Sequence, residues 1–329
     1  MLQLKNNTPF SADIATLPNE EGIDSLYILA KATFKIGEQW TLTEEQPEPV
    51  LADEYWGEPE YSSLKKISDY HLGKSNTDIL MTGSAFSANS SFVSELDVHL
   101  RVGQCNKTVR VFGDRQWNNG LISKATPFQS MPMVFERAYG GQHTKNDVIY
   151  CEESNPIGVG FCGKRNINEL NGLHLPNLED PQQLISTFND RPTPACFSPI
   201  SAHWQPRVSF SGTYDELWQK TCAPYLPKDF DKRFFNSAAS ELIYPGFLTG
   251  GEQVEITNMH PKGSLKFSLP FVKLKSDVLI DNNINTVALN LETLLIEPND
   301  LIISMVWKGS LLCDKKIQKI KQITLNLSR

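Results

Sequence analysis

Residues 28–36 read Ile-Leu-Ala-Lys-Ala-Thr-Phe-Lys-Ile, and this stretch indicates the fold class. Every second residue from Ile28 to Ile36 is apolar, and the residues between them are mostly polar. Successive side chains of a β-strand point to opposite faces, so the pattern is typical of a strand with one buried and one outward face. Gly37 and Glu38 then separate this strand from residues 40–43, which we expect to be its hairpin partner.

The same alternation recurs along the chain, whereas a 3.6-residue period is weak throughout. We expect hairpin turns near 104–107 and at 297–300, and short helices over 215–220, with Asp215 as the N-cap, and over 234–239. The segments that the alternation predicts to be strands are 28–36, 95–102, 108–112, 265–271, 286–296 and 301–306.

The stretch from about 150 to 207 differs from the rest, because it is rich in Pro, Asn and Gly and shows little alternation. Irregular segments of this length are uncommon in compact domains unless they are functional. We therefore predict a mainly β fold of sandwich-like antiparallel sheets with long irregular loops and a few short helices. The chain, 1–329, is interpreted as a single domain, divisible into an N-terminal β part (1–150), an irregular connection (151–207) and a C-terminal β part (208–329).

Composition and charge exclude several classes of partner. Hydrophobic residues make up 40% and charged residues 21% of the chain, and the net charge is −7. A nucleic-acid-binding protein needs a basic face, because phosphate neutralisation supplies most of its affinity. The only lysine-rich stretch is the tail, with Lys315, Lys316, Lys319 and Lys321. We therefore expect no nucleic-acid partner.

The first residues, Met-Leu-Gln-Leu-Lys-Asn-Asn, lack the basic start and apolar run of a signal peptide. No stretch reaches 18 continuous apolar residues, so no membrane span is predicted. The six cysteines are scattered and irregularly spaced, which is typical of free thiols in a reducing compartment. The sequence thus predicts a cytoplasmic protein without a membrane partner.

Residues 158–164, Gly-Val-Gly-Phe-Cys-Gly-Lys, have the spacing of a phosphate-binding loop, G-x-x-x-x-G-K. Arg165 follows, however, where Ser or Thr would ligate magnesium. The flanking residues 155–157 and 166–168 fit neither a buried strand nor a helix start. We interpret the glycines as turn residues, and nucleotide binding is the weaker alternative.

Other catalytic patterns are weaker still. The histidines stand far apart, and neither Cys-x-x-Cys, His-Glu-x-x-His nor G-x-S-x-G spacing occurs. Cys162 and His143 are the residue types of a nucleophile and base, without local support. The acidic and aromatic cluster 53–61 resembles a glycosidase site in residue type only, and a contact surface or a solvated loop explains it as well. We predict no catalytic residues, no cofactor and no metal site, with a carbohydrate-active or nucleotide-binding enzyme as the alternative.

Aromatic and arginine side chains in loops are the remaining functional signal. Trp, Tyr and Arg dominate binding hot spots, although they also pack and form ion pairs inside proteins. For any single one of these residues the structural role is favoured over the binding role. The candidate protein-interaction residues are Tyr55, Trp56, Arg115, Trp117, Arg137, Tyr139, Trp204, Arg207 and Arg233.

These segments resemble, in this order and over nearly the whole chain, the bacterial domain-of-unknown-function family 2169. The segment Cys162-Gly163-Lys164 departs from the pattern expected of that family. The motifs that carry the resemblance are 31–34 (KATF), 51–59 (LADEYWGEP), 96–98 (LDV), 111–115 (VFGDR), 131–132 (MP), 135–141 (FERAYGG), 155–161 (NPIGVGF), 175–181 (LPNLEDP), 204–207 (WQPR), 212–215 (GTYD), 226–236 (LPKDFDKRFFN), 250–252 (GGE), 295–298 (LIEP) and 306–307 (VW).

The resemblance implies a non-enzymatic cytoplasmic adaptor or chaperone of the type VI secretion system. Such a protein would bind a PAAR or PAAR-like spike-tip domain, or the toxin effector attached to it, and would promote loading of that cargo onto the VgrG spike. The family supplies neither catalytic residues nor a residue-level binding map. The effector, the binding face and the oligomeric state are left open.

We predict that Lys164→Ala leaves folding and partner binding unchanged, because residue 165 cannot ligate magnesium and the flanks do not fit a phosphate loop. Titration calorimetry with ATP and magnesium should give no heat of binding for either protein. Tight magnesium-dependent binding that disappears in the variant would refute the prediction.

Overall fold

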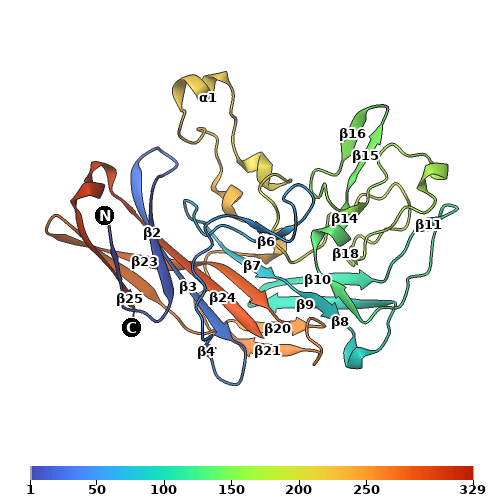
Figure 1. Ribbon diagram of the computed structural model, residues 1–329, viewed down its shortest axis with the longest axis horizontal. Helices are drawn as coiled ribbons and strands as arrows, with labels where there is room; N and C mark the ends of the chain where they lie inside the picture. Colours follow the sequence, from blue (N-terminus) through green and yellow to red (C-terminus); the bar gives the residue numbers. More distant parts are fainter. Residues whose placement is uncertain (1, 329) are drawn as a thin grey trace.

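The computed structural model describes residues 2–328 and confirms the mainly β prediction (Figure 1). Its larger, ten-stranded sheet has the order β1-β25-β22-β23-β24-β3-β2, with β7 beside β23, β19 beside β7, and β4 beside β3. The strands of this sheet are β1 (Leu4–Asn6), β2 (Ser11–Pro18), β3 (Asp24–Lys35), β4 (Thr41–Leu42), β7 (Thr77–Met81), β19 (Ile243–Tyr244), β22 (Leu274–Ile280), β23 (Asn283–Glu297), β24 (Ile302–Leu312) and β25 (Ile320–Leu327).

A second, five-stranded sheet has the order β18-β10-β9-β20-β21. Its strands are β18 (Leu178–Glu179), β10 (Cys105–Phe112), β9 (Glu95–Val102), β20 (Gln253–Thr257) and β21 (Leu265–Ser268). Short two-stranded pairs make up the remaining β-structure: β5 (Glu54–Tyr55) with β6 (Leu64–Lys66), β8 (Ser84–Phe86) with β13 (Ser130–Pro132), β11 (Trp117–Asn118) with β12 (Leu121–Ile122), β14 (Tyr139–Gly140) with β17 (Val159–Gly160), and β15 (Gln142–Lys145) with β16 (Val148–Cys151).

Helices are short. The single α-helix of the described residues is α1 (Glu216–Thr221), and the predicted cap is present, because Asp215 Oδ1 accepts from the Trp218 amide at 2.8 Å. The 3₁₀ helices are η1 (Ala88–Ser90), η2 (Phe135–Arg137), η3 (Ile167–Leu170), η4 (Arg207–Phe210), η5 (Lys232–Phe235), η6 (Ser240–Leu242) and η7 (Asp314–Lys319).

The predicted helix over 234–239 is wrong, because only its start lies in η5 and the chain then runs on without helix to η6. The Asn236 side-chain amide and the Ser237 backbone amide donate to the buried carboxylate of Asp78, so these two residues do not continue the helix. The predicted strand 265–271 ends at Ser268, ahead of Pro270. The other predicted strands all lie in strands of the two sheets, and the 297–300 turn joins β23 to β24.

The strand that indicated the fold class is buried on both faces, which corrects the half-buried expectation. In β3 the outward set, including Leu29, Lys31 and Thr33, is as inaccessible as the apolar set. The segment that follows β4 covers this face: Gln46 accepts from and donates to the Thr33 backbone, and Lys31 reaches Asp69 at 3.4 Å. Strand β3 is therefore a central strand with both faces covered, although its sequence has the alternating pattern of a half-buried strand.

The larger sheet nearly closes into a barrel. Strand β1 pairs in parallel with β25. It also contacts β2, the strand at the other end of the strand order. The two chain ends consequently lie close together at one side of the molecule (Figure 1). One main hydrophobic core, from Phe10 to Leu325, contains side chains of both sheets. A smaller core around Trp117 and Tyr139 supports the irregular lobe between β10 and β18.

A buried ion pair joins the larger sheet to the segments that form the candidate site. Lys74 Nζ lies 2.7 Å from Asp78 Oδ2 and 2.9 Å from the Thr293 hydroxyl, and neither charged side chain is exposed. Asp78 also accepts from Asn236 Nδ2 at 2.8 Å and from the Ser237 amide at 2.7 Å. A buried carboxylate needs such partners, because its desolvation is otherwise very costly.

A β-bulge places a second charged cluster beside the first. The register of β23 and β24 shifts at Glu292, whose Oε1 accepts from the Lys74 amide at 3.0 Å. Its Oε2 has no hydrogen bond and lies 3.6 Å from Lys308 Nζ and 3.8 Å from His71 Nε2. Burial raises the pKa of Glu292 and lowers the pKa of Lys308 to about 8, so desolvation outweighs their mutual attraction.

We expect Asp78→Ala to lower the free energy of unfolding by about 3–5 kcal/mol, because it leaves the Lys74 ammonium buried and unpaired. Asp97→Ala is the matched control, since it breaks a 2.7 Å ion pair with Arg110 that lies at the surface. That loss should be about 0.2–1 kcal/mol. Urea denaturation of both variants tests the difference, and equal losses would contradict the role of the buried pair.

Candidate functional site

The candidate site is a groove of about 520 Å³ where the smaller sheet meets the 3₁₀ helices that follow the irregular segment. Its walls come from η4, η5 and η6, from β10 and from residues 193–195. These elements are far apart in the sequence, and the segment between η5 and η6 is fixed to β7 by the hydrogen bonds that residues 236 and 237 donate to Asp78. This wall of the groove is therefore linked to the buried ion pair described above.

Arg207, at the start of η4, forms the inner wall of the groove. Its Nε donates to the Phe234 carbonyl at 3.0 Å, and Nη1 donates to the carbonyl of Ile200. Burial lowers the pKa of this guanidinium, although an arginine stays charged at neutral pH. The side chain thus fixes η4 against η5 and also brings a positive charge to the groove.

Arg233, in η5, lies at the outer rim. Its guanidinium carbon stands 4.3 Å from the centre of the Phe210 ring, and its Nε donates to Asp231 at 2.9 Å. About two thirds of the side chain is exposed, at 66%. An accessible arginine stacked on an aromatic ring is already oriented, so it loses little entropy when it binds a partner.

The opposite wall carries a further ion pair. Lys107 of β10 lies 2.8 Å from Glu241 of η6, and the lysine is buried while the carboxylate is partly exposed. Hydrogen bonding and the charge of Lys107 lower the pKa of Glu241 against an opposing effect of burial, so this carboxylate is ionised at neutral pH. Both signs of charge therefore line the groove around apolar side chains such as Phe210 and Ile243.

A lobe formed by residues 211–230 projects from the molecule and carries α1 (Figure 1). Its two ends adjoin Phe210 and Arg233, which line the groove. Hydrogen bonds close its base, since Asp229 accepts from the Thr213 amide at 3.0 Å and from its hydroxyl at 2.7 Å. Three large apolar side chains of the lobe are strongly exposed, namely Tyr214, Leu217 and Tyr225. A compact loop with closed ends and an apolar surface is typical of a functional loop.

Most of the candidate residues predicted from sequence lie inside the molecule. Trp117 and Tyr139 belong to the smaller core, and Trp204 packs edge-on against Phe135. Arg115 is buried with the carboxylate of Glu179. These side chains hold the irregular lobe and its neighbours in place, the role that was favoured for any single residue.

The accessible members of the predicted set are dispersed. Arg137 is partly exposed and donates to Asn177 at 3.0 Å. Trp56 is half exposed, with Lys65 Nζ 5.0 Å from its ring, and Tyr55 is partly buried beside it. Only Arg207 and Arg233 of this set line the groove. Its other walls, including Lys107, Phe210 and Glu241, were missed because no local pattern links residues that only the tertiary structure brings together.

Three backbone amides of the phosphate-like segment 158–164 are occupied by carbonyls of the same chain. The Gly158 amide donates to Asn155, Val159 to Ala138 and Phe161 to Gly140, all within the chain. Gly158 is required for close approach, since a Cβ there would lie 2.6 Å from the Ala138 carbonyl oxygen. A phosphate-binding loop instead needs amides that point to the ligand. The geometry therefore supports the interpretation of these glycines as turn residues.

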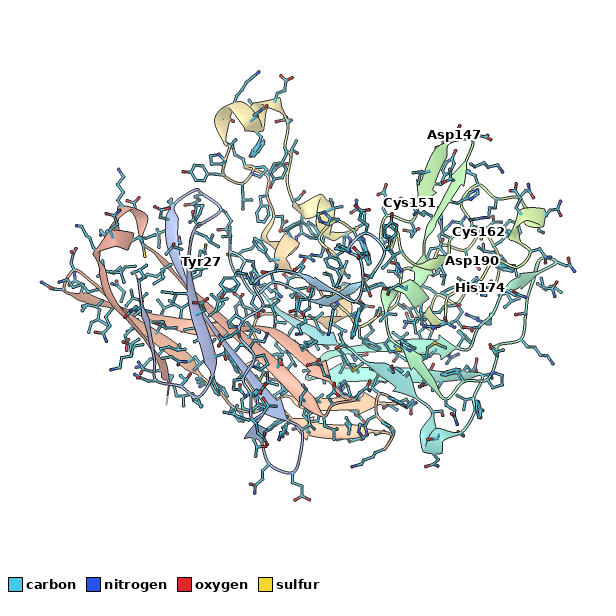
Figure 2. The ribbon with its side chains drawn as sticks, in the orientation of Figure 1. Tyr27, Asp147, Cys151, Cys162, His174 and Asp190 are labelled. Carbon is cyan, nitrogen blue, oxygen red and sulfur yellow. The ribbon has the colours of Figure 1, made fainter. Side chains whose placement is uncertain are left out.

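Titratable side chains in and beside the irregular lobe are buried or hydrogen-bonded within the protein. Figure 2 shows Cys162 in this lobe and Asp190, which follows β18, on the same side of the molecule, far from Tyr27 on the larger sheet. Burial raises the pKa of the Cys162 thiol, which disfavours the reactive thiolate. Amides of Ser186 and Thr187 donate to Asp190 and lower its pKa to about 2. In residues 2–328 no group of three His, Cys, Asp or Glu side chains is placed to hold a metal ion.

The sequence matches the family described as "Uncharacterized protein conserved in bacteria (DUF2169)" over residues 21–308. The chain belongs to the DUF2169 family. The match includes β3, the buried Lys74–Asp78 pair, the irregular lobe and every wall of the groove. No curated protein and no solved structure matches the chain. Within the described residues, no helix has the length and apolar character needed to cross a bilayer.

Trp117→Ala should lower the free energy of unfolding by about 3–5 kcal/mol, because it removes a fully packed ring from the smaller core. Trp56→Ala should cost less than about 1 kcal/mol, since that ring is half exposed. Chemical denaturation followed by intrinsic fluorescence compares the two variants. A larger loss for Trp56→Ala would contradict the assignment.

Proposed function

We propose that this protein is a non-enzymatic adaptor of a bacterial type VI secretion system. It binds a PAAR or PAAR-like spike-tip domain, or the toxin effector attached to it, and promotes loading onto the VgrG spike. The secretion role rests on what the resemblance of its motifs to the DUF2169 family implies. The observation on the molecule that carries the proposal is the groove with Arg207 and Arg233, flanked by the apolar lobe 211–230.

The groove and the lobe have the features of a protein interface. Arginine and tyrosine are enriched among residues that contribute most to binding, and clusters of exposed apolar side chains mark interaction sites. Arg233 can donate to a carboxylate or carbonyl of the cargo while Tyr214, Leu217 and Tyr225 bury apolar surface. A standard interface buries about 1,600 Å² in total, which requires both the groove and the lobe to take part.

Charge favours the same assignment. The net charge of −7 would speed the encounter with a basic cargo, and the mixed charges of the groove would set its orientation. Increasing salt should therefore slow association more than it speeds dissociation. Two of the charged side chains that line the groove have partners within the chain, because Arg233 pairs with Asp231 and Lys107 pairs with Glu241.

We expect Arg233→Glu to weaken binding of a cognate PAAR-like protein by roughly thirtyfold, because the loss of an arginine hot spot costs about 2 kcal/mol. Arg101→Glu, on the exposed side of β9, is the matched control and should change binding less than about twofold. Biolayer interferometry with the purified partner measures both values.

Deletion of the gene should stop secretion of one effector while the apparatus still secretes its structural proteins. Normal delivery of every effector in the deletion strain, together with no PAAR-like or effector protein co-purifying with the chain, would overturn the adaptor proposal. Saturable turnover of a nucleotide or sugar substrate by the pure protein would favour the enzymatic alternative.

A further inference from the structure

Arg207 is a buried cation without an anionic partner. Only 8% of this residue is exposed, and it forms no ion pair with another of residues 2–328. A buried charge is unfavourable unless a partner of opposite sign offsets its loss of hydration. Every other buried lysine or arginine among the described residues has such a partner, in the pairs Lys31–Asp69, Lys74–Asp78, Lys107–Glu241, Arg115–Glu179 and Lys308–Glu292.

The guanidinium of Arg207 also keeps a donor that the protein does not use. Nε donates to the Phe234 carbonyl at 3.0 Å and Nη1 donates to the Ile200 carbonyl, whereas Nη2 has no acceptor among residues 2–328. Nη2 is not one of the polar atoms that are both unpartnered and inaccessible. Because Arg207 lines the groove, we infer that the N–H groups of Nη2 are open to a ligand there.

The carboxylates near Arg207 are engaged by other groups. Asp78, whose negative charge favours the charged guanidinium, is held by Lys74, and Glu241 lies 2.8 Å from Lys107. The side chains that line the groove include three that are positive and two that are negative, although the whole chain has a net charge of −7. The groove is therefore complementary to an anionic group. The charged lining residues are Lys107, Arg207, Arg233, Asp180 and Glu241.

Apolar side chains surround this unpaired charge. Phe210, Ile243, Pro194 and Ala238 line the same groove, whose volume of about 520 Å³ is typical of a site for a small ligand group. A guanidinium binds a carboxylate through its fork of N–H donors, and apolar walls favour an apolar side chain. The last residue of a peptide chain offers both groups together when its side chain is apolar. An internal Asp or Glu offers the carboxylate alone.

We propose that the groove captures the carboxyl terminus of a partner protein whose last residue has an apolar side chain. The terminal carboxylate accepts from Nη2 of Arg207, and the last side chain packs against Phe210 and Ile243. This inference rests on the proposed function in one respect, that the groove is a protein interface, and it names the part of the partner that enters it.

Fluorescence anisotropy of the full chain with labelled octapeptides tests this proposal. Each peptide begins with glycine and serine residues and ends in valine followed by leucine, isoleucine, phenylalanine or valine, with a free carboxyl group. At least one should bind with a Kd below about 1 mM, and its C-terminal amide should bind at least about tenfold more weakly, because the amide has no charge. An amidated peptide with an internal glutamate should bind as weakly as the other amides.

Arg207→Met should weaken binding of the free-acid peptide at least about tenfold and leave binding of the amide unchanged, because it removes the charge that recognises the carboxylate. Arg207 also fixes η4 to η5, so circular dichroism must show that this variant folds.

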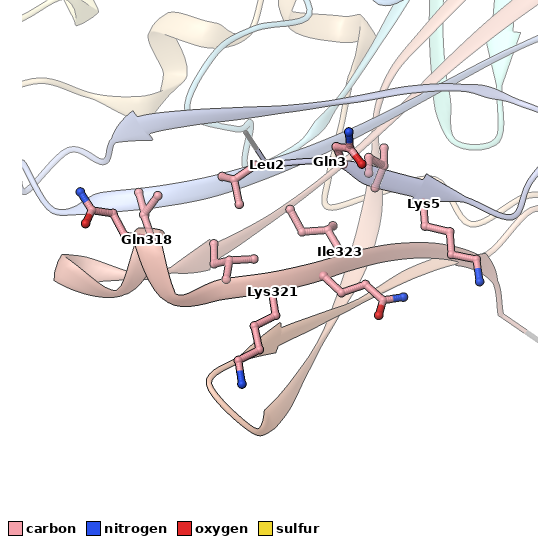
Figure 3. Close-up of a pocket in the computed structure, with 10 residues that line it drawn as sticks. Leu2, Gln3, Lys5, Gln318, Lys321 and Ile323 are labelled. Carbon is pink, nitrogen blue, oxygen red and sulfur yellow. The ribbon is translucent and has the colours of Figure 1, made fainter.

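Gln183→Glu tests the same charge without removing Arg207. Gln183 is exposed and lines the groove, and its Oε1 accepts from the Thr193 amide at 3.0 Å, a bond that a carboxylate oxygen can also accept. The added negative charge should weaken binding of the free-acid peptide at least about threefold. Gln318→Glu is the matched control and should change binding less than about twofold, since Gln318 lies in η7 beside the gap between β1 and β25, outside the groove (Figure 3).

Three results would each overturn the proposal: no binding of any free-acid peptide up to about 1 mM, equal binding of acid and amide, or equal effects of Gln183→Glu and Gln318→Glu. These results are distinct from failure of the adaptor proposal. If the intact partner binds while the peptides do not, only this inference fails. If a free-acid peptide binds while no PAAR-like or effector protein co-purifies with the chain and every effector is delivered without it, only the adaptor role fails.

Discussion

The buried pair of Lys74 and Asp78 is the interaction on which the arrangement of this protein depends. The central strands β3 and β7 of the larger sheet are covered on both faces, so the carboxylate of Asp78 in β7 does not reach water. Such a buried charge needs a partner of opposite sign or several hydrogen bonds, because the free energy of removing an unpaired ion from water is otherwise very unfavourable. Asp78 meets this requirement with four donors from three residues, Lys74, Asn236 and Ser237, in two separate parts of the chain.

This constraint also positions the surface that we associate with binding. The donors to Asp78 at residues 236 and 237 fix the chain between η5 and η6, and Arg207 fixes η4 to η5 through the Phe234 carbonyl. The groove and the base of the lobe 211–230 are built on these short helices. A rigid support of this kind lets loops present aromatic and arginine side chains without a large entropic cost on binding.

The irregular lobe shows how a chain with little regular structure stays ordered. A small core around Trp117 and Tyr139 supports it, and the buried pair of Arg115 and Glu179 joins its two ends. Glycines such as Gly158 allow backbones to approach where any side chain would collide. The same glycines match the spacing of a phosphate-binding loop. Close backbone packing therefore explains this sequence match.

Much of the fold could be predicted from the sequence alone, because strand alternation and caps are local properties. The period of two in 28–36 and 95–102 identified strands, and Asp215 identified the start of α1. Local pattern could not show that Lys31 and Thr33 face a covering segment, nor that Asn236 bonds to Asp78 instead of continuing a helix. Residue type predicted Arg207 and Arg233 as interaction residues. It could not distinguish these two, which line the groove, from Trp117 and Arg115, which are buried elsewhere. Burial and partner choice depend on contacts between residues far apart in the chain, and only the tertiary structure decided them.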